Sequence, residues 1–482
     1  MCAFATPFFF KSTFFLLCFY SSSYFLVAQN SNSSFSPLGS KIYADKISEL
    51  EKYKVPKEYD DKSSQAWHQE ILTNRKEMLL SAFKDDELVY DTLLLEKVKS
   101  IYKKIATTNK QFRFDNINLY INRTPVANAA CWGEGTILVN LGLFLWADNE
   151  DELALVLSHE MAHQLLNHYD ENVRKKIATL TSDDFKAELK QIKKADYGKY
   201  ERFKNLMKGI TIESGKHSRY KESAADSLGA IFCKNAGYNV ANGARMLLKL
   251  ENVDDLFTSG KLYTLKDYIS SAPVDLTYFT VKPKYKGLSS VELTMNADKD
   301  FDSVKTHPDC IKRYEHITGT TTKPASACCT SLNSEYKIYK ERAMVEIVRS
   351  LYENNSMAYC IHQCLFAIAN KYEPAFYKYM LSMCFSKIYY NDKNLKRFNS
   401  VNTGAVMGST LKELQEYLFN VSNADLETLA LYFLSNNNES SSEDYEFANL
   451  MYQTRVKLKE KESSYQSYHS KFPNGKYAYL IK

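Results

Sequence analysis

Residues 149–169 contain neither proline nor glycine, and their apolar side chains recur at helical spacing over a broad face. Asn149 followed by Glu152 predicts a capping box at the start of this segment. Such an apolar helix has to be buried against other elements. The apolar positions are Leu153, Val156, Leu157, Met161, Leu165 and Leu166.

The same segment contains the sequence His159-Glu160-Met161-Ala162-His163. Residues four apart lie one turn apart on the same helix face, so both imidazoles can bind one metal ion. Glu160 projects near that face and can accept a proton from metal-bound water. A surface helix with two incidental histidines is the alternative. The apolar flanks disfavour it, because a buried histidine pair requires partners. His168 lies about two and a half helical turns beyond His159, which makes it a poor candidate ligand.

A catalytic zinc ion takes three protein ligands and leaves a fourth position open, so a third ligand must come from elsewhere in the chain. Glu222 is the best candidate, because Glu222 and Asp226 lie four apart and share a helix face. One carboxylate can bind the metal while the other orients a ligand histidine. The small residues at 223–225 would let this helix pack closely on the first. A solvated glutamate on a lysine-rich helix is the alternative.

These motifs, taken together, resemble metallopeptidase family forty-eight, the gluzincin family of HtpX and the CAAX prenyl endopeptidases. Besides the His-Glu-x-x-His motif, the resemblance rests on Asn128-Ala129-Ala130, on Ile137-Leu138-Val139 and on Thr306-His307-Pro308 to Arg313. It covers roughly residues 65–320 and is to the soluble exported branch, which has tetratricopeptide-like helical domains at the C-terminus.

The resemblance implies one zinc ion per chain, with His159, His163 and Glu222 as ligands and Asp226 supporting the metal site. It implies that Glu160 is the general base of a zinc endopeptidase. His307 or Arg313 is a candidate donor to the oxyanion, although a helix-start His-Pro and a surface arginine explain these residues equally well. Strand 136–140 is expected to pair with an extended substrate, and Asn128, Ile137 and Val139 are assigned to that substrate site.

The expected fold class is mainly α with a small β-sheet, an α+β zincin (gluzincin) peptidase domain followed by an all-α domain of helical-repeat type. The predicted boundaries are a signal peptide over 1–28, a linker over 29–64, the peptidase domain over 65–322 and the helical domain over 323–482. Two short strands are predicted at 119–121 and 137–139, a charged helical insertion at 170–216, and further helices at about 219–235 and 241–250.

The composition and net charge of the chain exclude several classes of protein. The 482 residues are 45% hydrophobic and 25% charged, which is the balance of a folded protein rather than a disordered one. A formal charge of +5 over this length indicates no nucleic-acid partner. The apolar run at 14–27 ends in Leu26-Val27-Ala28, which predicts a cleaved export signal, with an uncleaved anchor as the alternative. No transmembrane span is expected after its removal.

The sequence therefore predicts an exported zinc endopeptidase, periplasmic or envelope-associated if bacterial. Its substrates would be extracytoplasmic peptides and proteins, misfolded or envelope proteins among them. Envelope protein partners would dock on the helical tail. A helical-repeat binding or chaperone-like protein with a silent or autoinhibited peptidase fold is the alternative. The cysteines, ten in all, allow either disulfides or a core role as small buried residues.

Overall fold

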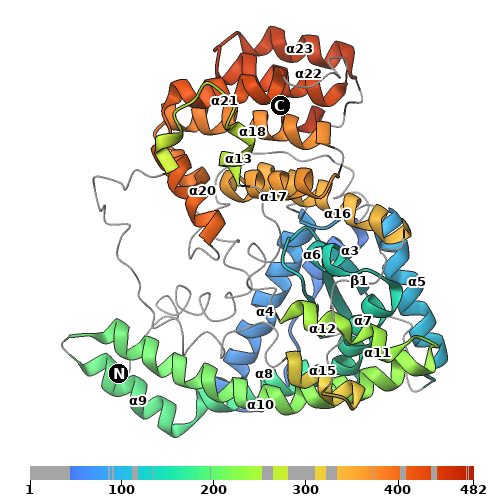
Figure 1. The fold of residues 1–482 in the computed structure, drawn as a ribbon. Helices are drawn as coiled ribbons and strands as arrows, with labels where there is room; N and C mark the ends of the chain where they lie inside the picture. The colour runs from blue at the N-terminus through green and yellow to red at the C-terminus, as the bar shows by residue number, and fades with distance from the viewer. Residues whose placement is uncertain are drawn as a thin grey trace.

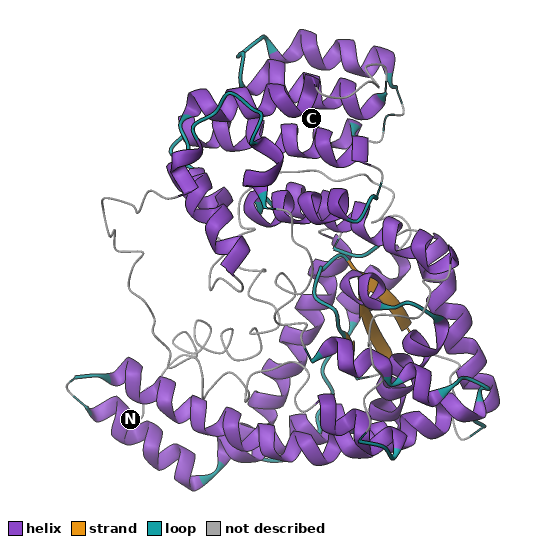
Figure 2. Ribbon diagram, in the orientation of Figure 1, coloured by secondary structure: helices purple, strands orange, loops and turns teal. Residues whose placement is uncertain are grey.

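The computed structural model describes residues 44–84, 87–89, 92–110, 118–133, 135–195, 197–251, 264–279, 310–321, 334–372, 374–401, 409–435, 442–473, 475 and 477–481. The predicted signal peptide lies outside these residues. Figure 1 shows the chain as a ribbon, and Figure 2 shows the sheet surrounded by helices. The mainly α fold with a small sheet is confirmed.

The first half of the chain contains the sheet and its surrounding helices. Its elements are α3 (Ala44–Lys52), α4 (Lys62–Lys84), α5 (Thr92–Thr108), β1 (Asn118–Asn122), β2 (Ala129–Cys131), β3 (Thr136–Asn140), α6 (Leu141–Trp146), α7 (Glu150–Leu165), α8 (His168–Thr181), α9 (Asp183–Lys194), α10 (Lys199–Asn235), α11 (Val240–Gly243) and α12 (Arg245–Leu250).

The later described elements are helical. They are α13 (Leu265–Ile269), η3 (Leu276–Phe279), α15 (Cys310–Thr318), α16 (Ser334–Glu353), α17 (Met357–Ala369), α18 (Pro374–Lys393), α19 (Arg397–Val401), α20 (Ser409–Asn420), α21 (Asn423–Ser435), α22 (Glu443–Arg455), α23 (Lys461–Lys471) and η6 (Ala478–Leu480). Among the helices of the described ranges, none has the length and apolar character needed to cross a bilayer.

The sheet has the strand order β1-β3-β2, so the predicted strands at 119–121 and 137–139 are confirmed as β1 and β3. β1 runs parallel to β3, with Ile121 opposite Val139, and β2 runs antiparallel to β3, with Ala130 opposite Leu138. β3 is therefore the central strand, and the short strand β2 lies at the edge that contacts α7.

α7 is the predicted apolar helix, and it packs against α10, α5, α11 and β2. It begins where the sequence indicates, because the Asn149 side chain accepts the Glu152 N–H at 3.1 Å. The predicted capping box forms only in part. The Glu152 carboxylate accepts the N–H of Asp148 at 2.7 Å, one residue earlier than in the usual box.

α10 is far longer than the predicted helix at 219–235. It ends as predicted at Asn235, followed by Gly237 with a φ of 77°, but it begins at Lys199. The charged region that precedes Arg219 contains no proline, so nothing in it forces the helix to end. The predicted helix at 241–250 is divided into α11 and α12.

The predicted helical insertion at 170–216 corresponds to α8, α9 and the first half of α10. Leu180 and Phe185 are buried in a small core of their own, against Trp67, Leu189 and Phe203. Part of the predicted linker is also ordered, since residues 44–52 form α3, which packs on α4.

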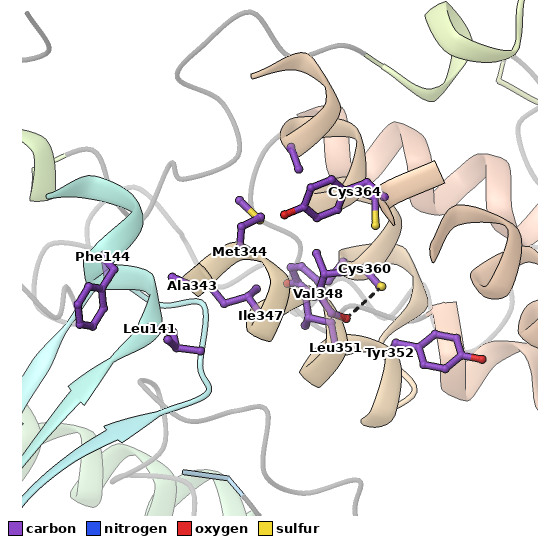
Figure 3. Packing of buried hydrophobic residues seen from close by; sticks show 14 of the residues in the cluster. Leu141, Phe144, Ala343, Met344, Ile347, Val348, Leu351, Tyr352, Cys360 and Cys364 are labelled. Atoms are coloured by element: carbon purple, nitrogen blue, oxygen red, sulfur yellow. Dashed lines mark hydrogen bonds between the residues drawn. The ribbon is translucent and has the colours of Figure 1, made fainter. Parts of the chain in front are cut away.

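α16 lies beyond the predicted domain boundary at 322, yet it packs on α6 and α5 of the first half. Figure 3 shows Ala343 and Ile347 of α16 close to Leu141 of α6, with α17 following on the other side. Arg123, after β1, donates to Glu353 at 2.7 Å. The largest apolar cluster of the described residues thus continues across the predicted boundary.

A buried ion cluster fixes α16 to the start of α7. Lys249 Nζ lies 2.6 Å from Asp148 Oδ2 and 2.7 Å from Glu152 Oε1, and Lys340 Nζ lies 2.5 Å from Asp148 Oδ1. Burial opposes ionisation of Asp148, but its hydrogen bonds to Lys249 and Lys340 outweigh that effect and lower its pKa. Each charge in the cluster is thereby paired inside the core, as buried charges have to be.

Removing one of these charges should lower stability. For Lys340→Met we expect a loss of about 1–3 kcal/mol in the free energy of unfolding, because Asp148 stays buried with Lys249 alone. Urea denaturation followed by circular dichroism measures this change. The matched control is Lys337→Met on the same helix, where the exposed pair with Glu341 spans 3.7 Å and the expected change is about 0.5 kcal/mol or less. Equal losses in both variants would contradict the assignment.

Candidate metal centre

Two helices bring three potential ligand side chains together. His159 and His163 lie one turn apart on α7, and Glu222 reaches them from α10. His159 Nε2 lies 3.0 Å from His163 Nε2 and 3.3 Å from Glu222 Oε2. His163 Nε2 lies 3.4 Å from Glu222 Oε1. Within the described part of the chain, this is the one group of histidine, cysteine and acidic residues that meets the geometric requirement for a metal site.

The spacing of these atoms suits a tetrahedral zinc ion. With bonds of about 2.0–2.1 Å, two ligands on tetrahedral zinc are separated by roughly 3.3 Å. Two imidazole nitrogens and one carboxylate form the donor set of many catalytic zinc sites, in which a fourth position stays open. The three side chains are only partly exposed, so one face of the group remains accessible.

Asp226 and Arg313 orient His159. The Nδ1 atom of His159 lies 2.9 Å from Asp226 Oδ1, so a proton shared there leaves the Nε2 lone pair directed at the metal position. Arg313 of α15 holds Asp226 with two charge-assisted hydrogen bonds, from Nε and Nη2, each of 2.8 Å. Asp226 is only 3% exposed, which makes this bidentate pairing necessary for its charge.

The pKa values of these residues reflect the pairing. Burial and the Arg313 charge act to lower the pKa of His159, but hydrogen bonds to Asp226 and Glu222 outweigh them and raise it to about 10. Burial acts to raise the pKa of Asp226, and its hydrogen bonds to His159 and Arg313 instead lower it to about 2. Both carboxylates, Asp226 and Glu222, are therefore ionised near neutral pH, because the pKa of Glu222 is also well below its usual value.

His168 is a residue of the site that the sequence analysis did not assign. Its Nδ1 lies 2.8 Å from Nδ1 of His163. The contact forms because α7 ends at Leu165 and Asn167 adopts a left-handed conformation with a φ of 52°, which turns the first residue of α8 back toward α7. A continuous helix, as assumed from the sequence, would direct His168 elsewhere.

His168 can accept a hydrogen bond from the Nδ1–H group of His163. Burial together with the charges of His163 and Lys221 lowers the pKa of His168 to about 4, so its ring is neutral at pH 7. A neutral ring has one nitrogen lone pair, and a proton donated from His163 Nδ1 leaves the Nε2 atom of His163 for a metal. His168 thus lies outside the group of three potential ligands and is placed to orient His163.

Glu160 is held by the edge strand. The Cys131 N–H of β2 donates to Glu160 Oε2 at 2.8 Å, and the Glu160 side chain is largely buried. Burial raises the pKa of Glu160 above the usual value for a glutamate. A carboxylate with one oxygen fixed by a backbone amide and a raised pKa is well suited to accept a proton on its other oxygen.

α7 and α10 approach each other most closely at Gly229. A Cβ atom added there would lie 2.9 Å from the backbone nitrogen and 3.0 Å from the Cα of His159. The space permits only glycine, so the sequence Asp226-Ser227-Leu228-Gly229 sets the distance between the two helices. That distance in turn places Glu222 and Asp226, on preceding turns of α10, beside the two histidines of α7.

The predicted substrate strand requires correction. Ile137 and Val139 lie on β3, which pairs on both sides and has no edge for a substrate to occupy. β1 and β2 are the two edge strands of the described sheet, and the outer side of β1 is bridged by Leu88 to Asn122, so β2 is the candidate edge for a substrate. The Asn140 N–H donates to Asn128 O, and the Trp132 N–H donates to Thr136 O, so Asn128 and Trp132 direct these backbone groups toward β3. By alternation along the strand, the backbone groups of Ala129 and Cys131 face away from β3. Asn128 borders this edge strand.

The two residues predicted as candidate oxyanion donors are His307 and Arg313, and the structure describes only Arg313. His307 lies outside the described residues. Arg313 is at the site, but its Nε and Nη2 atoms are committed to Asp226 and its Nη1 lies 3.5 Å from Glu222 Oε2. Its side chain therefore orients the carboxylates. The proposal that it donates to an oxyanion is not supported by this geometry.

Comparison with known proteins agrees with this geometry. Residues 93–321 match Peptidase family M48, a family of zinc metalloproteases. This range contains all of the residues named above for the candidate metal centre. The family resemblance seen in the motifs is thereby confirmed over these residues. A curated relative, the beta-barrel assembly-enhancing protease of Yersinia pestis, is 30% identical over 81 residues, which cover 17% of this chain and 16% of that protein. The chain thus spans only a small part of that relative's length.

The close helix contact at Gly229 predicts that replacing this glycine by alanine lowers the stability of the protein. In an ordinary helix interior, Gly→Ala stabilises a protein by about 0.4–1 kcal/mol. For Gly229→Ala we expect instead a loss of about 1–3 kcal/mol, because the added methyl forces two backbones apart. Thermal and urea unfolding measure the change, with Ser223→Ala on the exposed face of α10 as control. A more stable Gly229→Ala protein would show that the helices are not held this closely.

Proposed function

We propose that this chain, whose residues 93–321 match Peptidase family M48, is a zinc-dependent endopeptidase acting on extracytoplasmic proteins. The observation that carries the proposal is the meeting of His159, His163 and Glu222 within 4.8 Å, at the spacing of tetrahedral zinc ligands. Glu160 lies on the same helix, one residue after the first histidine. Two histidines and a glutamate as zinc ligands, with a glutamate of the same helix as base, form one known active-site set of metallopeptidases.

The protein residues would divide the work as follows. His159, His163 and Glu222 would hold one zinc ion, oriented by Asp226 and His168. When bound, the ion supplies Lewis acidity, which makes a nearby water more acidic and a peptide carbonyl more electrophilic.

Glu160 would act as the general base. Its Oε2 atom is occupied by the Cys131 N–H, so Oε1 is the atom that would accept a proton from the attacking water. The same atom would then deliver that proton to the leaving amine nitrogen, which leaves Glu160 ionised for the next turnover.

The outward edge of β2 would position the substrate. The N–H and C=O of Ala129 face away from β3, so an extended peptide could add to this edge as a further strand. Main-chain pairing of this kind depends little on substrate side chains. It suits an enzyme that acts on unfolded or misfolded segments, which offer an extended backbone.

The setting of this activity remains part of the proposal. The apolar segment before Gln29 supports export, and with it a periplasmic or envelope-associated location if the source is bacterial. The helices after residue 323 would contact envelope protein partners. The alternative, a helical-repeat binding or chaperone-like protein with a silent or autoinhibited peptidase fold, receives less support, because the candidate ligands lie together with Glu160 beside them.

Replacing His163 should lower zinc binding more than replacing His168 does. We expect about one zinc per chain in the wild type and little in His163→Ala, which removes a ligand. His168→Ala should bind zinc about 10–100-fold more weakly, because His163 loses its orienting partner. Elemental analysis and chelator competition give both values. The exposed His316→Ala serves as control, and a full equivalent of zinc in His163→Ala would exclude the site.

Glu160→Gln should retain zinc and the fold but lose hydrolysis, since an amide cannot accept the proton of water. We expect turnover of an unstructured casein substrate to fall by a factor of about 10²–10⁴ or more. Glu188→Gln, on the exposed side of α9, is the matched control and should keep full activity. Undiminished cleavage by Glu160→Gln would refute the assignment of the base.

A further inference from the structure

Two helices of the C-terminal half, α18 and α22, are each followed by a leucine whose backbone is left-handed. Leu395 has a φ of 57° and Leu458 a φ of 55°. This conformation is strained for leucine, because its Cβ atom lies too close to the following carbonyl oxygen. The turn after α16 has the same conformation but places Asn355 there, with a φ of 59°. Asparagine tolerates a left-handed backbone far better than leucine does.

Neither leucine is compensated by packing within the chain. Leu395 is 96% exposed and Leu458 is 70% exposed, so most of each side chain lies in water. An exposed leucine adds little hydrophobic stabilisation, and glycine or asparagine would fit such a turn with less strain. An apolar environment outside the chain would reverse this balance, because each side chain would then leave water.

The two turns lie at the same end of a pair of helices. α18 and α22 pack side by side in the C-terminal half (Figure 1). Near the start of both helices, the ring centroids of Tyr379 and Tyr445 are 5.8 Å apart. Near the other end, Lys461 Nζ lies 5.1 Å from the ring centroid of Tyr390. The helices therefore run in the same direction, and both leucine turns follow their common end.

Lysines surround both leucines. Residues 393–396 and 457–461 contain five lysines and one glutamate, and we refer to these two segments as the leucine-lysine end. Lys457 pairs with Glu427. Lys393, Lys396 and Lys459 are exposed and form no ion pair with any residue that the structure describes. Exposed apolar side chains among unpaired lysines suit an anionic lipid surface, which offers acyl chains to the former and head groups to the latter.

We propose that the leucine-lysine end binds the surface of a bilayer rich in anionic lipid, with Leu395 and Leu458 inserted among the acyl chains. Transfer of one leucine side chain out of water favours binding by roughly tenfold or more. Each lysine beside anionic lipid favours binding by about fivefold. These factors multiply, because both turns meet one surface. A protein partner would need a matching apolar pocket for each leucine, whereas a bilayer accepts both.

Binding to vesicles tests the proposal. The protein is purified without the predicted signal 1–28, so that the apolar run at 14–27 cannot insert. Co-sedimentation compares vesicles of phosphatidylcholine alone with vesicles of equal parts phosphatidylcholine and phosphatidylglycerol. We expect a partition coefficient about tenfold or more higher on the anionic vesicles, and a loss of this preference at high salt. Protein that sediments with neither kind of vesicle, or equally with both, would overturn the proposal.

Replacing both leucines separates insertion from folding. Leu395→Asn/Leu458→Asn should bind anionic vesicles about 10–100-fold more weakly. Its melting temperature should rise by about 1–3 °C, because asparagine relieves the strain of the two turns. Leu431→Ala, at a half-exposed leucine of α21, is the control and should bind as the wild type does. Unchanged binding by the double variant, or weaker binding together with a lower melting temperature, would contradict the assignment.

Replacing the lysines tests the recognition of head groups. Lys393→Gln/Lys396→Gln/Lys459→Gln should bind anionic vesicles about 10–100-fold more weakly and lose most of the salt dependence. A preference for anionic vesicles that survives in this variant would exclude the leucine-lysine end as its source. Casein hydrolysis without vesicles should be the same in all of these variants as in the wild type. The outcome for membrane binding is thus independent of the proposed peptidase function.

Discussion

The close contact of α7 with α10 is the constraint on which the site depends. Neither helix carries a complete metal site. α7 provides two imidazoles and a base, and α10 provides two carboxylates. Gly229 allows the backbones to approach to a distance that no other residue would permit, and Glu222 and Asp226 then reach the histidines without strain. The apolar surfaces of both helices and the sheet supply the free energy that holds this approach in place.

Around this contact, each of the two candidate ligand histidines and the candidate base has its own orienting partner. Asp226, itself held by Arg313, fixes His159, and His168 fixes His163. Glu160 is fixed by a backbone N–H of the edge strand. The orienting groups come from four different elements, α10, α15, α8 and β2. The geometry of the centre therefore depends on elements spread over residues 129–318 of the chain.

Local signals in the sequence were sufficient for the helix of His159 and for Glu222 with Asp226, because cap, period and spacing are encoded within one element. They were insufficient for His168, whose position depends on a left-handed Asn167 that ends α7. The order of the strands could not be predicted from local signals, because β2 has only three residues. Its pairing with β3 makes β3 the central strand and β2 an edge strand. Arg313 was found as a residue of the site, yet its role follows from a carboxylate on another helix.

The pairing of Lys340 with Asp148 joins residues 192 positions apart in the sequence. Contacts of such separation form late, because the intervening chain must first be closed into a loop. A nascent chain that has emerged as far as α15 already contains the ligands and the base of the candidate site. It still lacks Lys340, one of the two lysines paired with the buried Asp148 carboxylate at the start of their helix. The region around the candidate site therefore reaches its full stability only after α16 has been synthesised.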